Sequence, residues 1–392
     1  MGHPSTRSWH KAEGCLVALV ASGVLTAGCA GAGQQPRRAE PLPSTAAPST
    51  AAPSATDSPR PAPSTTSAPG ATVTTATPSP HRATGTITLG FAGDVHFAEV
   101  LAPRLSDPET ALRPIRRALS QPDLMMVNLE TAITERGVPF PKDFNFRAPA
   151  SALDALDAAG VDVVTMANNH AADYGAVGLR DTLAAVRHSP LPVVGIGEDV
   201  SAAFAPYETS IGGTRVAVLA ATTLPDETAT HWAATRDEPG VAVALLPKPR
   251  LTAAVRAAKR HADVVVVYLH WGDENVACPY WRPIEHARAL AAAGADVIVG
   301  SHAHVLLGAG WLGDSFVDYG LGNFVWYNQA HLETGIVTVT VRDGRVVANS
   351  LAPATIGPDG LPVLLTGSAK DQAVADWRAL RACTNLTHRR GG

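Results

Sequence analysis

The feature that most constrains the fold is the run DVVVVYLH at residues 263–270, which is apolar over almost its whole length. A strand of this kind is buried on both faces and therefore belongs to a sheet that is covered on both sides. A second such run, ADVIVG at 295–300, follows a stretch at 283–294 whose apolar spacing predicts a helix. Strand, helix and strand in this order are typical of an α/β fold.

The same alternation of short apolar runs and helical stretches begins near Thr86. It predicts a mixed sheet, or two stacked sheets flanked by helices, because the last three apolar runs have the pattern of antiparallel strands. The other predicted strands are 86–93, 124–128, 161–167 and 214–222, and the three antiparallel ones are 315–320, 335–341 and 345–353. The predicted helices are 108–119, 150–160, 176–188, 250–261, 283–294 and 369–383.

The first 28 residues have the pattern of an export signal. Arg7 and Lys11 precede an apolar run at 15–27, which is shorter than the about 20 residues needed to span a bilayer. The sequence LTAGCA around Cys29 resembles a bacterial lipobox, in which the cysteine becomes the lipidated first residue after cleavage. We therefore expect an extracytoplasmic protein anchored in the membrane through Cys29, with simple secretion as the alternative.

Residues 29–85 consist largely of Pro, Ser, Thr, Ala and Gly. A segment without large apolar residues cannot form a core, which predicts a disordered tether. At about 3 Å per residue when fully extended, this tether would reach on the order of 100 Å from its anchor. The chain is thus expected to divide into a lipoprotein signal peptide (1–28), a tether (29–85), a folded domain (86–365) and a C-terminal helix and tail (366–392).

Charge and cysteine content narrow the possible partners and the compartment. The 31 basic and 35 acidic residues give no basic excess for nucleic acid, so we expect no nucleic-acid partner. Cys278 and Cys383 lie within the folded part, and an oxidising compartment favours a disulfide between them. A free thiol or a metal ligand at Cys278 is the alternative, because this residue closely follows the segment HWGDE.

Polar residues follow five of the predicted strands at the point where each strand ends. The carboxyl ends of strands form the site in open α/β sheets, so these side chains are expected to converge. Each alone has an ordinary alternative as a turn, cap or core residue. The residues are Asp94 and His96, Asn128 and Glu130, Asn168, Asn169 and His170, His270, and finally His302 and His304 in GSHAH.

Two carboxylates, several imidazoles and an amide oxygen suit borderline divalent ions such as Mn, Zn or Fe better than Mg or Ca. The candidates outnumber the ligands of one tetrahedral ion, which favours two ions that share one carboxylate. Such a pair lowers the pKa of a bound water, and a nearby imidazolium can protonate a leaving group. The sequence therefore predicts a dinuclear site of unknown metal identity.

This set of motifs resembles the calcineurin-like metallophosphoesterase superfamily, whose fold is a layered αββα sandwich with mixed sheets. The usual bridging acid there is Asp, whereas Glu130 in NLE is one methylene longer, which bears on the metal spacing. Asp173 in HAADYG either orients His170 or caps the helix that begins near Gly175. The resemblance implies Asp94 and His96 on the first metal, Glu130 as the bridge, Asn169, His270 and His302 on the second metal, His304 on the first, and His170 as the donor to the leaving group.

The ordered segments NLE, FRAP, GVDVVTMANNHAADYG, HWGDE, AGADVIVGSHAHV and YGLGNFVW resemble the CapA family of poly-γ-glutamate capsule synthesis proteins, a branch of that superfamily. Members typically read GHHPH where this chain has GSHAH, but both histidines of the pair are kept. The resemblance implies a membrane-anchored accessory protein that serves an anionic polymer together with membrane subunits for its synthesis. A metal-dependent phosphoesterase unrelated to capsule is the alternative function, and a folded module with vestigial ligands is a third.

Overall fold

The computed structural model describes residues 85–247, 249–327 and 330–391. The predicted signal peptide, Cys29 and the tether up to residue 84 lie outside the described residues. Among the described helices, none has both the length and the apolar character needed to cross a membrane.

Two mixed sheets carry the fold, one of eight and one of six strands. In spatial order, the eight-stranded sheet consists of β18 (Pro362–Leu364), β17 (Arg345–Ile356), β16 (Glu333–Arg342), β1 (Thr86–Val95), β2 (Leu124–Leu129), β5 (Val163–Thr165) and β6 (Val193–Val194), with β15 (Asn323–Val325) also paired to β1. The six-stranded sheet consists of β13 (Ala309–Leu312), β14 (Ser315–Asp318), β12 (Val297–His302), β11 (Val264–Trp271), β9 (Thr214–Thr222) and β8 (Tyr207–Ile211). Two short pairs complete the strands: β7 (Ile196–Gly197) with β10 (Gly240–Val241), and β3 (Ala132–Ile133) with β4 (Arg147–Ala148).

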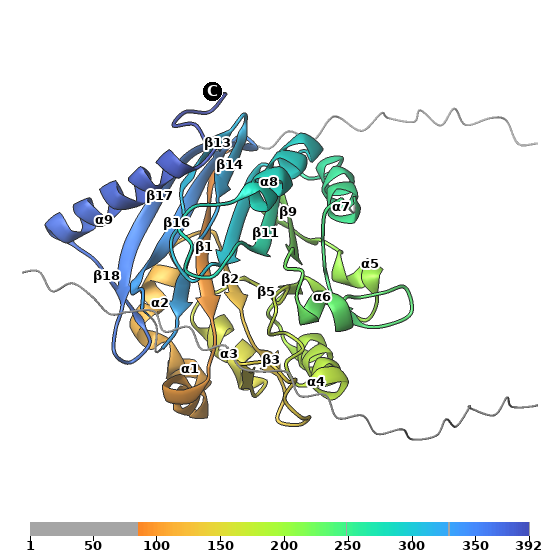
Figure 1. Ribbon diagram of the computed structural model, residues 1–392. Coiled ribbons are helices and arrows are strands. Elements are labelled where there is room, and N and C mark those ends of the chain that lie inside the picture. The colour runs from red at the N-terminus through yellow and green to blue at the C-terminus, as the bar shows by residue number, and fades with distance from the viewer. Residues whose placement is uncertain (1–84, 248, 328–329, 392) are drawn as a thin grey trace, which may run out of the picture. The chain divides into compact units, whose positions relative to one another are not determined.

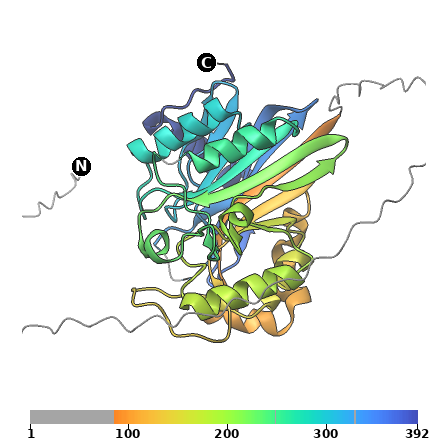
Figure 2. The same cartoon turned by 90° about the vertical axis from the view of Figure 1, so that its right-hand side faces the viewer.

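Helices flank the stacked sheets, as Figures 1 and 2 show. The two faces of the six-stranded sheet follow the period of two along its strands. On β9, Val216 and Val218 pack into the core shared with the eight-stranded sheet, whereas Ala217 and Leu219 pack with the helices outside. The helical segments are η1 (Glu99–Ser106), α1 (Pro108–Ala111), α2 (Arg113–Leu119), α3 (Ser151–Ala158), α4 (Gly175–His188), α5 (Val200–Ala203), α6 (Glu227–His231), α7 (Arg250–Lys259), α8 (Trp281–Ala293), α9 (Gly367–Ala379) and η2 (Leu380–Cys383).

The predicted layered α/β sandwich with mixed sheets is confirmed, with two differences in detail. The predicted helix 108–119 divides at Leu112, because Pro114 in the following turn has no N–H to continue the hydrogen-bond ladder. Residues 315–320 were expected to form an antiparallel strand. The strand found there, β14, is antiparallel to β13 but parallel to its other neighbour, β12. The predicted C-terminal helix, α9, packs on β17 (Figure 1). Its Trp377 is buried.

A bulge in β1 sets the position of the first acidic residue. Between Phe91 and Asp94, the pairing of β1 with β2 shifts register, so β1 holds one residue more than its partner. A bulge of this kind changes where the following side chains point. Gly93 is required there, because a Cβ atom would lie 1.7 Å from the carbonyl oxygen of Gly322. The register then places Asp94 beside Asn128 on one side and Asn323 on the other.

The disulfide predicted between Cys278 and Cys383 is present. Their Cα atoms lie 5.6 Å apart, within the usual range for a disulfide. The bond joins the loop that follows β11 to η2 near the C-terminus. Cys278 is therefore neither a free thiol nor a metal ligand in this structure.

Candidate metal centre

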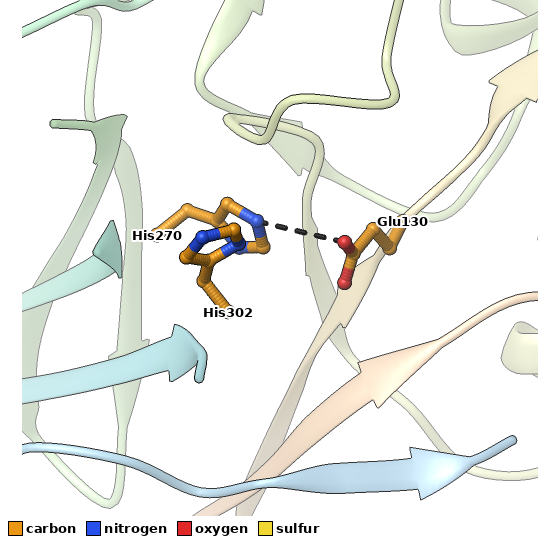
Figure 3. A group of neighbouring side chains, drawn as sticks. All are labelled: Glu130, His270 and His302. Atoms are coloured by element: carbon orange, nitrogen blue, oxygen red, sulfur yellow. Dashed lines mark ion pairs between the residues drawn. The ribbon is translucent and has the colours of Figure 1, made fainter. Parts of the chain in front are cut away.

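The polar residues at the strand ends meet where the two sheets face each other. Asp94 lies in β1 and Glu130 directly follows β2, while His270 lies in β11 and His302 ends β12. In Figure 3 the side chains of Glu130, His270 and His302 point toward one another across the space between the sheets. All four side chains are buried.

Among the described residues, possible ligand atoms lie within 4.8 Å of one another in three groups, two of which share Glu130. One of these two is Glu130 with His270 and His302, and the other is Asp94 and Glu130 with His304. The Nε2 atom of His270 lies 3.6 Å from Oε1 of Glu130, and Nδ1 of His304 lies 3.5 Å from Oδ2 of Asp94. Asn169 adds an amide oxygen, whose Oδ1 lies 2.8 Å from Nε2 of His270.

The two carboxylates have opposite electrostatic environments. Burial alone would raise the pKa of Asp94, but the hydrogen bond from His304 and the charges of His270 and His304 outweigh it, so this pKa lies well below its usual value. For Glu130, burial and then the nearby charge of Asp94 raise the pKa well above its usual value. Two carboxylates in one site repel each other, and a divalent cation between them would remove that penalty.

Most of the imidazoles are neutral, which is the form that binds metal. Burial lowers the pKa of His302 to about 3 and lowers that of His270 well below its usual value. Burial also opposes the charge on His304, but the hydrogen bond and charge of Asp94 prevail and raise its pKa.

Two buried atoms of the centre have no hydrogen-bond partner: Nδ1 of His302 and Oε1 of Glu130. Buried polar atoms are nearly always paired, so unpaired ones at one place indicate a missing partner. A nitrogen and a carboxylate oxygen of this kind are ligands that Mn, Zn and Fe accept. The residues of the centre therefore fit a divalent metal.

The two histidines of GSHAH have backbone angles that are unusual for their residue type. His302 has φ 96° and His304 has φ 57°, in the region that favours glycine. Such conformations cost on the order of 1–3 kcal/mol each and persist where surrounding structure imposes them, often at functional sites. β12 ends at His302, so His304 lies beyond the strand. The ring centroids of the two histidines nevertheless lie 5.8 Å apart, so both imidazoles are at the centre.

His170 lies beside the centre and is held by Asp173. Its Nδ1 lies 2.7 Å from Oδ2 of Asp173, and its Nε2 lies 3.7 Å from Oε1 of Glu130. The sequence left open whether Asp173 orients His170 or caps a helix. The N-cap of α4 is Tyr174, and no side chain caps it, so the structure favours the orienting role. Burial lowers the pKa of His170, and the hydrogen bond to Asp173 opposes this shift.

His96 belongs to none of the groups of candidate ligands. Its ring packs among aromatic side chains, with centroids 4.1 Å from Trp326 and 4.6 Å from Phe146. Its Nδ1 accepts a hydrogen bond from the N–H of Ala98 at 3.3 Å, and its Nε2 is buried without a partner. A place for His96 on the first metal thus remains a prediction.

Residues 88–328 match the family model described as bacterial capsule synthesis protein PGA_cap. The chain belongs to this family. It is 30% identical over 305 residues to the capsule biosynthesis protein CapA of Bacillus anthracis, which covers 74% of this chain and 72% of that one. It is 34% identical over 219 residues to the PGA biosynthesis protein CapA of Bacillus subtilis, with 55% of each chain covered.

Solved structures also show similarity to this member of the PGA_cap family. A phosphatase from Mycoplasma pneumoniae aligns with a TM-score of 0.45 and 14% identity, over 74% of this chain and 97% of that one. A hypothetical protein from Thermus thermophilus aligns with a TM-score of 0.45 and 18% identity, over 69% and 99%. Likenesses of this degree say nothing about activity.

Asn128 was expected at the site from its place at a strand end but was given no role, and its Nδ2 donates to Oδ1 of Asp94 at 2.8 Å. Two further residues at the centre were not singled out from the sequence as functional. Glu274 groups with His302 and His304. Lys142 contacts the Asn169 carbonyl and Asp173 from a loop. The position of Glu274 in HWGDE is a signal that could have identified it, whereas nothing in the sequence distinguishes Lys142 from a surface lysine.

A cleft of about 380 Å³ opens beside the centre. Its walls carry both signs of charge, with Lys142 and Arg282 as cations and Asp226, Glu227, Asp273 and Glu274 as acids. Asn169 and His302 contribute the side chains of the centre to this cleft. A ligand in the cleft would therefore reach the candidate metal ligands directly.

Proposed function

We propose that this protein is a cell-surface, lipid-anchored component of poly-γ-glutamate capsule synthesis or export that carries a dinuclear metal centre. One observation carries the proposal: the segment matched by the PGA_cap family, 88–328, contains all the residues that form the buried ligand groups. The relatives named as capsule or PGA biosynthesis proteins CapA support the same role. An anionic polymer and membrane subunits for its synthesis are the partners that this role requires.

The two ligand groups support two ions rather than one, because they share Glu130 and otherwise use different residues. Asp94, Glu130 and His304 would hold one ion. Glu130, His270 and His302 would hold the other, with Asn169 beside His270. The donor set suits Mn, Zn or Fe. When bound, such ions supply charge for gripping an anion and lower the pKa of a bound water.

The protein's own residues would then bind, orient and move a proton. His170 presents Nε2 toward Glu130 and is positioned to donate a proton to a leaving oxygen. Asp173 fixes the ring through Nδ1 and stabilises the imidazolium form. The ring of Trp326 packs against His304, with the two centroids 4.8 Å apart.

Deletion of the gene in its own host tests the capsule role. We expect loss of surface γ-linked glutamate polymer, which plasmid-borne wild type restores and Glu130→Gln does not. An unchanged amount of polymer after deletion would exclude the capsule role.

In the same strains, labelling with a palmitate analogue tests the lipid anchor. We expect label on the wild-type protein and none on Cys29→Ala.

A metal-dependent phosphoesterase unrelated to capsule is the second candidate. The observation that favours it is the His170–Asp173 pair, because simple binding of a polymer needs no proton donor oriented in this way. Turnover of an aryl phosphodiester by purified protein, compared with His170→Ala, tests it. We expect a loss of about 10²–10⁴-fold on removing a general acid. If metal-loaded protein hydrolyses no phosphoester, the phosphoesterase function is excluded and only the binding role remains.

A further inference from the structure

A lysine from a distant loop reaches the backbone of the candidate centre. Nζ of Lys142 donates to the carbonyl oxygen of Asn169 at 2.8 Å and lies 2.5 Å from Oδ1 of Asp173 as an ion pair. It also lies 3.3 Å from Nδ1 of His170. Only 17% of the Lys142 side chain is exposed, and 1% of Asp173.

We propose that Lys142 is a positioning residue of the centre. By binding Asn169 through its carbonyl and His170 through Asp173, its ammonium holds these two adjacent residues at once. Asn169 then keeps its amide oxygen toward His270, and His170 keeps Nε2 toward Glu130. The catalytic part of this inference rests on the proposed function, whereas the structural part does not.

The surrounding hydrogen bonds show why a cation is needed there. Oδ2 of Asp173 already accepts from the N–H of Phe146 at 2.6 Å and contacts His170, so its Oδ1 has Lys142 as the countercharge. The carbonyl of Asn169 also accepts from the hydroxyl of Thr228 at 3.0 Å. A buried carboxylate without a countercharge is strongly unfavourable, so removal of the ammonium should let the loop rearrange.

Direct binding of an anionic ligand is the competing role, because Lys142 also lines the cleft. The two roles differ in kinetics. Loss of a positioning residue lowers kcat with little change in KM, whereas loss of a contact that holds the bound substrate raises KM with kcat unchanged.

The test uses the full chain with Lys142→Met, Lys142→Arg and the matched control Lys259→Met. Lys259 pairs with Asp296 at 2.6 Å in the same way, but away from the centre. The readouts are affinity for Mn²⁺ and Zn²⁺ by titration calorimetry, the imidazole ¹⁵N–¹H spectrum of histidine-labelled protein, and steady-state hydrolysis of an aryl phosphodiester. The Nδ1–H signal of His170, assigned with His170→Gln, reports on its bond to Asp173.

We expect Lys142→Met to weaken metal affinity about 10–100-fold, which is typical when a group that orients a ligand is removed. The His170 Nδ1–H should exchange with water about 10-fold faster or more, as for a locally opened hydrogen bond. Lys142→Arg should recover part of both effects, and Lys259→Met should match wild type.

The proposal would be overturned if Lys142→Met had the same metal affinity and the same His170 Nδ1–H exchange rate as Lys259→Met. An increase in KM alone, with unchanged spectrum, would assign Lys142 to ligand binding instead. If wild type binds metal but turns nothing over, the phosphoesterase function fails, while the affinity and the spectrum still decide the role of Lys142.

Discussion

The two sheets contribute different chemistry to the candidate centre. The eight-stranded sheet and its loops supply oxygen ligands from Asp94, Glu130 and Asn169, whereas the six-stranded sheet and the turn after it supply the imidazoles of His270, His302 and His304. The donors are thus divided between two layers, and the oxygen ligands lie far from the imidazoles in the sequence. A complete ligand set exists only when the sheets are stacked, so metal binding should report on the packing of the whole domain.

The oxygen ligands and the imidazoles, which form the two halves of the centre, are also held in place differently. On the oxygen side, side chains hold one another, because Asn128 donates to Asp94 at 2.8 Å and accepts from Asn168 at 2.9 Å. On the imidazole side, a backbone hydrogen bond and a covalent link act in addition to side-chain contacts such as that of His304 with Asn323 at 2.7 Å. The N–H of Asn275 donates to the carbonyl of Ala303 at 2.8 Å, and the same loop is tied to η2 by the disulfide.

The largest effect is expected from breaking the covalent link on the imidazole side. Replacing both Cys278 and Cys383 by Ser should lower the free energy of unfolding by about 4 kcal/mol, because the sequence separation is 105 residues. Urea unfolding under non-reducing conditions measures the change. A loss below about 1 kcal/mol would mean that this loop is held by its other contacts.

The next effect concerns a single imidazole. His302→Ala should weaken Zn²⁺ affinity about 100-fold or more, beyond what loss of an orienting group causes. His286→Ala is the matched control, because His286 is a buried histidine of α8 outside the ligand groups. Calorimetric titration measures both variants, and equal affinities would exclude His302 as a ligand.

On the oxygen side, Asn128→Ala should cost about 1–3 kcal/mol of stability. The change removes a donor to Asp94 and leaves Nδ2 of Asn168 with one acceptor fewer, and buried unpaired polar groups carry a penalty of this size. Thermal and urea unfolding of the metal-free protein would show it. A neutral result would mean that the side-chain network does not organise this half.

A buried carboxyl outside the centre sharpens the contrast with Asp94. Asp318 on β14 is fully buried, and burial raises its pKa to about 8. The folded state therefore binds a proton that the unfolded state has lost, and stability should fall as pH rises from about 4 to about 8, by up to about 1.4 kcal/mol per pH unit. Asp318→Asn should remove this slope, as measured by urea unfolding at pH 5, 6 and 7. Parallel pH profiles would contradict the expected shift.

Much of the fold follows from local patterns. Runs such as residues 263–270 are apolar on both faces, and the layered architecture follows from burying them. The ligand groups could also be predicted from the sequence, because His270 and His302 stand at strand ends, where parallel strands bring side chains together. The role of Lys142 could not be predicted, because its contacts to Asn169 and Asp173 depend on how a loop folds back, which no periodicity encodes.

The central claim is that one metal centre, shared through Glu130, is built across both sheets. Metal content per chain tests it most directly, measured by inductively coupled plasma mass spectrometry after loading with Mn²⁺, Zn²⁺ or Fe²⁺ and exhaustive buffer exchange. We expect about two ions per full-length wild-type chain, as in two-metal sites, and loss of both in Glu130→Gln, because both ligand groups contain this residue. Wild type that retains none of these metals, or a Glu130→Gln variant that retains two ions, would contradict the account.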